Sequence, residues 1–108
     1  MAAAILDVDI NEGETFLMSI EFWEDSDNTI PVDITRDTFT GAMQIGQKYI
    51  PIDMSFGSLT VNVLNMEIPY GTMVDLAKTG KYDVEQQQGD EKFRLIQGRI
   101  RVNKEVTI

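Results

Sequence analysis

Alternation of apolar and polar residues with a period of two runs through most of the chain and predicts β-strands. In the first apolar stretch Leu6, Val8 and Ile10 fall on one face, and Asp7 and Asp9 fall on the other. Comparable alternation recurs at residues 15–24, 37–46, 49–54 and 58–65. Each of these stretches has the pattern of a strand with one buried face and one face in water, so we predict an all-β domain.

The second stretch has an apolar face and a second face that is only partly polar. Its apolar face carries Phe16, Met18, Ile20 and Phe22. The opposite face carries polar residues interrupted by Leu17 and Trp23. We therefore predict that Leu17 and Trp23 form an exposed apolar strip and are interface residues.

Two later stretches give more specific expectations. In residues 58–65 the alternation sets Leu59, Val61 and Val63 on the apolar face of a strand. Pro51 has no N–H to donate to a ladder, so its segment is predicted to be an edge strand or the start of a strand.

The last two stretches predict a hairpin that turns at Gly89 and Asp90. In its second strand the apolar positions change parity, from Phe93 and Leu95 to Ile96, Ile100 and Val102. A one-residue shift would expose the whole apolar set, so we predict a β-bulge over 96–98, with Gly98 tolerating the kink. Beyond the bulge, Ile100 and Val102 are expected to be buried in the core.

Residues 72–79 are the only stretch with a helical pattern. Thr72 is a candidate N-cap, with Asp75 three residues later, and Gly80 stands where a helix C′ glycine is common. With this short helical turn and about seven short strands, the chain is predicted to be an antiparallel, Ig-like β-sandwich. Its 108 residues are expected to form a single domain over 1–108.

Composition excludes most kinds of chemistry. The chain has no cysteine and no histidine, which removes thiolate metal sites, cysteine nucleophiles and every Ser-His arrangement. We expect no enzymatic activity and no bound cofactor or metal. The net charge of −9 argues against binding to nucleic acid or to an anionic membrane surface. No apolar run approaches the roughly 20 residues needed to cross a bilayer.

The charge is distributed unevenly along the chain. Residues 1–33 contain acidic residues and no basic ones, whereas residues 92–108 contain five basic residues and one acidic residue. The basic residues of this last segment are Lys92, Arg94, Arg99, Arg101 and Lys104. This polarity is either internal, with the last strand beside an acidic neighbour, or external, steering copies into register. Arg99 and Arg101 are the interface candidates under the external interpretation.

Three groups of residues suggest other sites. The turn at 24–28 offers Glu24, Asp25, Asp27 and Asn28, which are oxygen ligands of the kind that calcium takes. Trp23 together with Tyr49 or Tyr70 is a candidate aromatic platform for sugars. Asp7 and Asp9 are a carboxylate pair of the type used in hydrolysis, although their position predicts a solvent-facing pair.

The final hairpin resembles the closing segment of small phage structural modules. In those modules a Gly-x-Tyr-Asp-apolar strand, a turn, and an Arg-Leu-apolar strand lead to Glu-Val-Thr. The corresponding residues here are Gly80, Tyr82, Asp83, Val84, Arg94, Leu95, Ile96, Gly98, Ile100, Val102, Glu105, Val106 and Thr107. Residues 10–35 are similar to the opening of the same modules, including their Pro-apolar-Asp-apolar-Thr segment. The family is the phage baseplate upper protein and tail-fibre anchoring domain group.

This resemblance implies a phage virion structural protein, located in the virion after synthesis in the host cytoplasm. Because no fibre or receptor-binding domain follows Ile108, we expect an adaptor or decoration subunit of the tail, baseplate or capsid. Its partners would be other virion proteins, met in several copies of a symmetric assembly. The alternative is a stand-alone carbohydrate- or calcium-binding β-sandwich that uses the acidic turn and an aromatic platform.

Overall fold

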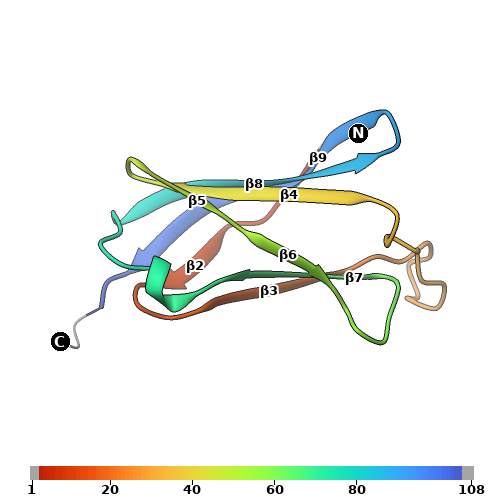
Figure 1. Cartoon of the computed structure of the whole chain (residues 1–108), viewed down its shortest axis with the longest axis horizontal. Coiled ribbons are helices and arrows are strands. Elements are labelled where there is room, and N and C mark those ends of the chain that lie inside the picture. Colours follow the sequence, from red (N-terminus) through yellow and green to blue (C-terminus); the bar gives the residue numbers. More distant parts are fainter. Residues whose placement is uncertain (1–2, 106–108) are drawn as a thin grey trace.

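The computed structural model describes residues 3–105, which form two β-sheets packed face to face (Figure 1). The strands are β1 (Ala4–Ile5), β2 (Val8–Asn11), β3 (Phe16–Glu21), β4 (Thr38–Ile45), β5 (Lys48–Pro51), β6 (Asp53–Phe56), β7 (Val63–Ile68), β8 (Thr79–Gln88) and β9 (Glu91–Asn103). The predicted all-β sandwich is thus confirmed, with nine strands in place of about seven, of which β8 and β9 are long.

The larger sheet has six strands and contains the only parallel pairings among the described strands. Its order is β1-β9-β8-β4-β5, with β2 following β1 along β9. Both β1 and β2 run parallel to β9, with Val8 opposite Ile100 and Asn11 opposite Asn103. The smaller sheet is antiparallel throughout, in the order β3-β7-β6. The sandwich is therefore mixed and not purely antiparallel, because the first two strands pair in parallel with the last one.

One side of the sandwich is closed by a single bent segment. β5 is the edge of the larger sheet and β6 is an edge of the smaller one, with only Ile52 between them, so the chain passes directly from one layer to the other (Figure 1). Pro51 ends β5 at this edge. The prediction that the Pro51 segment is an edge strand is confirmed.

The core between the sheets is apolar and rich in methionine. The most deeply buried side chains are Ile34, Met43, Ile45, Leu64, Met66, Ile68, Met73, Val84 and Ile100. Ile100 is 2% and Val102 5% exposed, so both are buried as predicted. On β3, the residues Phe16, Met18 and Ile20 pack against this cluster, whereas Leu17 faces outward with 69% exposure.

The hairpin of β8 and β9 turns at Gly89 and Asp90 as predicted, but its bulge lies elsewhere. Val84 pairs with Ile96 and Glu85 pairs with Arg94, so the extra residue is Leu95 and not one of residues 96–98. Gly98 is needed for a different reason. The chain between β1 and β2 crosses it so closely that a Cβ atom at Gly98 would lie 1.9 Å from the carbonyl oxygen of Leu6.

The helical turn predicted over 72–79 is also wrong. The structure has a single 3-10 turn, η1 (Tyr70–Thr72), and Asp75 takes a left-handed φ of 53°. Gly80 lies inside β8, where a Cβ atom would meet the backbone oxygen of Gln44 at 2.5 Å. Backbone groups that a helix would pair locally are instead held by Glu12 and Lys48, as described below.

Residues 58–63 differ from their predicted pattern as well. β7 begins only at Val63, and its buried positions are Leu64, Met66 and Ile68. Leu59 is 95% exposed and Val61 is 45% exposed, both in the connection from β6 to β7. Leu59 and Val61 therefore do not lie on the apolar face of a strand, and this prediction is wrong for both.

Candidate functional site

The acidic N-terminal part of the chain lies against the basic C-terminal strand. Asp9 on β2 forms an ion pair with Arg101 on β9 at 3.2 Å. Two residues earlier in both segments, the Asp7 carboxylate accepts a 2.8 Å hydrogen bond from the backbone N–H of Arg99. The internal interpretation of the charge polarity therefore accounts for these contacts. Asp7 and Asp9 each bind a different partner, the Arg99 N–H and the Arg101 side chain, so they are not a carboxylate pair across a cleft.

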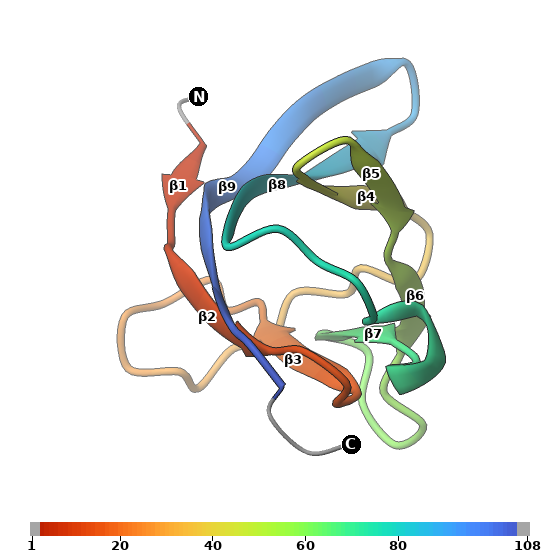
Figure 2. The same ribbon diagram turned by 90° about the vertical axis from the view of Figure 1, so that its left-hand side faces the viewer.

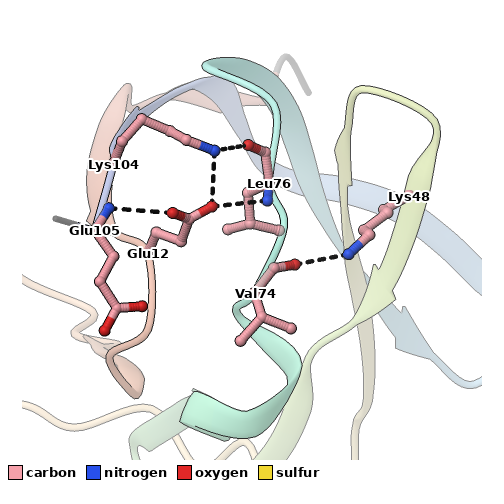
Figure 3. Close-up of polar contacts among 6 residues, drawn as sticks. All are labelled: Glu12, Lys48, Val74, Leu76, Lys104 and Glu105. Carbon is pink, nitrogen blue, oxygen red and sulfur yellow. Dashed lines mark hydrogen bonds and ion pairs between the residues drawn. The ribbon is translucent and has the colours of Figure 1, made fainter. Parts of the chain in front are cut away.

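Glu12 connects three segments at one end of the sandwich (Figure 3). Its Oε2 accepts 2.8 Å hydrogen bonds from the Leu76 backbone N–H and from the Lys104 ammonium, and its Oε1 accepts one of 3.1 Å from the Glu105 N–H. The Lys104 ammonium also donates to the Leu76 carbonyl. Hydrogen bonding to Lys104, and then to the two backbone amides, lowers the pKa of Glu12 from 4.5 to about 2.

Lys48 performs a similar task on the opposite side of the same connection. Its ammonium on β5 donates a 2.6 Å hydrogen bond to the carbonyl of Val74 (Figure 3). Glu12, in the turn after β2, and Lys48, on β5, thus hold the segment between η1 and β8 from two different parts of the chain. The sequence offered no signal for this arrangement, because the partners of Glu12 lie 64 and 92 residues away.

In the acidic turn at 24–28, the carboxylate of Asp25 is bonded to groups of the same loop. Asp25 accepts hydrogen bonds from the backbone N–H groups of Thr29 and Ile30, both at 2.9 Å, and from the Thr29 hydroxyl. These bonds, first that of the Thr29 hydroxyl, lower the pKa of Asp25. Asn28 takes a left-handed φ of 56°. Within residues 3–105 there is no group of three or more acidic side chains placed to hold a metal ion.

The four predicted interface residues are not brought together into one site. Leu17 is exposed on β3. Trp23 is half-buried just beyond β3, where it bridges to Pro31 and its Nε1 donates to Glu21 at 3.3 Å. Arg99 and Arg101 are exposed on β9, in the other sheet, with Arg101 in the ion pair with Asp9.

Three of the exposed large apolar side chains lie at one end of the sandwich, which we call the loop end. It comprises the connections at 22–37 and 57–62, which lie at the same end of the molecule (Figure 1). Its exposed members are Leu59 (95%), Ile30 (50%) and Val61 (45%). The two connections are joined by a 2.9 Å hydrogen bond from the Ile34 N–H to the Val61 carbonyl. Sequence reasoning missed Leu59 and Val61 because it assigned both to a buried strand face.

The outer face of the six-stranded sheet forms a shallow groove of about 800 Å³, lined by both polar and apolar groups. Ile5 on β1 and Tyr49 on β5 flank it, and Tyr49 is 75% exposed. On its floor Arg94 donates a 2.9 Å hydrogen bond to the Gln97 side chain and lies 3.7 Å from Asp83. Neither Trp23 nor Tyr70 lines this groove, so Tyr49 does not form the predicted platform with them.

Comparison with known proteins adds no family assignment, since no family model matches the chain and no curated protein matches it either. No helix within residues 3–105 is long and apolar enough to span a bilayer.

Proposed function

We propose that this protein is a structural protein of a phage virion, an adaptor or decoration subunit that binds other virion proteins of the tail, baseplate or capsid. The observation that carries the proposal is the loop end, where Leu59, Ile30 and Val61 present apolar surface to solvent. Large apolar side chains gathered in loops are typical of docking surfaces. The resemblance of the first and last strands to phage baseplate modules gives the class of partner.

The loop end is supported by a scaffold suited to docking without rearrangement. Asp25 fixes the 25–30 turn through its bonds to Thr29 and Ile30, and the Ile34 N–H ties this connection to Val61. A surface that is ordered before it binds loses less conformational entropy on association. Repeated use of such a surface in several copies around a symmetric particle is the arrangement we propose.

The proposal is tested on purified particles of the phage that encodes this protein. Mass spectrometry should detect the chain in the particles in stoichiometric amounts. A Leu59→Ser variant supplied in place of the wild type should be incorporated at least ten-fold less, because one exposed apolar anchor can dominate an interface. Tyr70→Ser is the matched control, since Tyr70 is 67% exposed in η1 and away from the 57–62 connection.

Two results would contradict the proposal. If the particles contain none of this protein, the virion role is wrong. If Leu59→Ser and Tyr70→Ser are both incorporated like the wild type, the loop end is not the docking surface.

A Trp23→Ala variant extends the test, because it should reduce incorporation while the domain stays folded. If Trp23→Ala unfolds the domain instead, then Trp23 belongs to the core.

The groove beside Tyr49 supports a second candidate, a carbohydrate-binding module. Its floor pairs opposite charges and carries amide groups, which suits a neutral polyhydroxylated ligand better than a charged one. Tyr49 supplies an exposed ring on which a sugar could stack. A glycan array probed with the wild type and with Tyr49→Ala tests this function, and binding that Tyr49→Ala abolishes would favour it over the virion role.

A further inference from the structure

The free strand edges of this sandwich differ in how well they are protected. The edge at β5 has four residues and ends at Pro51, which has no N–H to donate. The edge formed by β1 and β2 is interrupted where the chain leaves the ladder at Leu6 and Asp7. β6 also has only four residues. The remaining edge, β3, is six residues long and has neither a proline nor a bulge.

The backbone of β3 presents a row of unpaired groups on its outer side. The Phe22 N–H donates to the Asn62 carbonyl at 2.9 Å, which marks that pair as hydrogen-bonded in the β3–β7 ladder. Bonded pairs alternate along antiparallel strands. The N–H and C=O groups of Leu17, Ser19 and Glu21 therefore point away from β7. Among residues 3–105 no other segment forms a strand pairing with this side of β3.

The surface around this edge is acidic. The outward side chains of the three-stranded sheet include Glu21 on β3, Asp53 on β6 and Glu67 on β7. None of the strands of that sheet contains a lysine or an arginine. A strand added to β3 would therefore be favoured if it carried basic side chains, and a strand with acidic side chains would be repelled.

The chain itself contains a basic strand edge, at the start of β9. β1 begins to pair with β9 only at Ile96, so within the described part of the chain residues 91–95 have a neighbour on the β8 side alone. The Val102 N–H donates to the Lys78 carbonyl, so the backbone groups of every second residue from Val102 back to Ile96 face β8. The extra residue Leu95 shifts this alternation by one position. Before the bulge, the backbone groups of Phe93 therefore face β8, and those of Lys92 and Arg94 point outward. This part of the hairpin projects from the sandwich (Figure 2).

We infer that β3 of one copy receives the β9 edge of a second copy, Lys92 to Arg94, as an added antiparallel strand. In this register Glu21 lies opposite the Lys92 of the second copy, and Ser19 lies opposite its Arg94. The ion pairs of Lys92 with Glu85 and of Arg94 with Asp83 are long, at 3.5 and 3.7 Å, and lie between half-exposed side chains. Arg94 also donates a 2.9 Å hydrogen bond to the exposed Gln97 side chain. Such exposed contacts contribute little, so both side chains can exchange them for a partner on a second copy.

The contact is head-to-tail and not two-fold symmetric. Pairing β3 with β3 of another copy would bring two acidic faces together, whereas the β9 edge supplies the opposite charge. A pair of copies then keeps one free β9 edge on the first copy and one free β3 edge on the second, so the same contact repeats and gives a ring or a chain. This contact between copies would exist whether or not the chain is a virion protein, so its test does not depend on the virion proposal.

Sedimentation equilibrium of the purified chain, at concentrations up to about 1 mM, provides the test. The wild type should associate reversibly, and high salt should weaken the association. Ser19→Pro removes an outward N–H without breaking the β3–β7 ladder, and it should weaken association at least ten-fold. Ser19→Ala is the matched control, because it removes the 2.8 Å bond from the Ser19 hydroxyl to Asn65 but keeps the N–H.

A mixing experiment separates this arrangement from a two-fold dimer. The double variant Lys92→Glu/Arg94→Glu blocks the β9 edge and leaves β3 intact, whereas Ser19→Pro does the reverse. Each variant alone should be monomeric, and an equimolar mixture should form a dimer and nothing larger. Near-ultraviolet circular dichroism checks that both variants are folded.

Three results would overturn the inference. The first is a wild type that stays monomeric up to the highest concentration. The second is a Lys92→Glu/Arg94→Glu variant that associates like the wild type, which would indicate a different contact. The third is a mixture of the two variants that remains monomeric although both are folded.

Discussion

The hydroxyl of Tyr82 on β8 donates a 2.6 Å hydrogen bond to the backbone carbonyl of Leu6, 76 residues away. Burial, with the nearby charge of Asp7, raises the pKa of Tyr82, so the phenol remains a protonated donor at neutral pH. The Leu6 carbonyl lies where the chain steps from β1 to β2. Tyr82 therefore satisfies the Leu6 carbonyl where the pairing with β9 is interrupted between β1 and β2.

Replacing Tyr82 with phenylalanine should lower the free energy of unfolding by about 1–2 kcal/mol, because the Leu6 carbonyl loses its partner in a partly buried place. Urea denaturation followed by circular dichroism measures the change. Tyr49→Phe is the control, since the Tyr49 side chain is 75% exposed and its variant should match the wild type. Equal stability of the Tyr82→Phe variant and the wild type would mean that the bond contributes nothing.

Gly98→Val should lower the free energy of unfolding by about 1–3 kcal/mol, because the new side chain would collide with the Leu6 carbonyl and force the backbone to move. The cause is this crossing of two chain segments, and not a bulge at Gly98. Gly71→Ala is the control, since a Cβ atom there has no neighbour within 4 Å. Thermal denaturation compares the two variants, and a neutral Gly98→Val would contradict the close crossing.

Glu12 should make stability depend on acid pH. Its pKa is about 2 in the folded protein against an ordinary 4.5, so the folded state favours the charged carboxylate. The resulting stabilisation is complete above pH 4.5 and is lost as the pH falls toward 2. Glu12→Gln should be less stable than the wild type at pH 7, and this difference should shrink below pH 4.5.

Unfolding by urea between pH 2 and pH 7 measures this dependence. Glu14→Gln is the matched control, because Glu14 lies exposed in the same turn. A difference between Glu12→Gln and the wild type that is constant over the whole pH range would show that the carboxylate charge is not the cause.

The ion pair of Asp9 with Arg101 gives a prediction with a built-in rescue. Arg101→Glu would set two carboxylates side by side on β2 and β9, and should lower the free energy of unfolding by about 0.2–1 kcal/mol, as expected for an exposed pair. The double variant Asp9→Lys/Arg101→Glu should recover most of the loss, as measured by urea denaturation at low salt. If the double variant is no more stable than Arg101→Glu, the two side chains do not interact.

Local pattern was sufficient to predict the features that depend on neighbouring residues. The period-two alternation predicted the strands, the Gly89-Asp90 turn predicted the final hairpin, and the missing N–H of Pro51 predicted an edge. These features follow from backbone geometry and from the parity of nearby side chains.

Features that depend on distant partners were not predicted from the sequence. Leu59 and Val61 alternate like a strand, but no neighbouring strand pairs with them and both stay exposed. The helical pattern after Thr72 is overridden because Glu12 and Lys48 take up the backbone groups of Leu76 and Val74. The β3 edge could not be recognised from sequence either, because a free edge is defined by which strands are absent beside it.

The parallel pairing of β1 and β2 with β9 has a consequence for protein synthesis. Asp9 and Arg101 are 92 residues apart, so on the ribosome the first strands emerge long before the strand that receives them is made. Until β9 leaves the exit tunnel, β1 and β2 have no ladder to join, and the larger sheet cannot be completed. Contacts of such high sequence separation form slowly. The larger sheet is therefore completed only after β9 has left the tunnel, and a nascent chain stalled before residue 100 has an unfinished sheet.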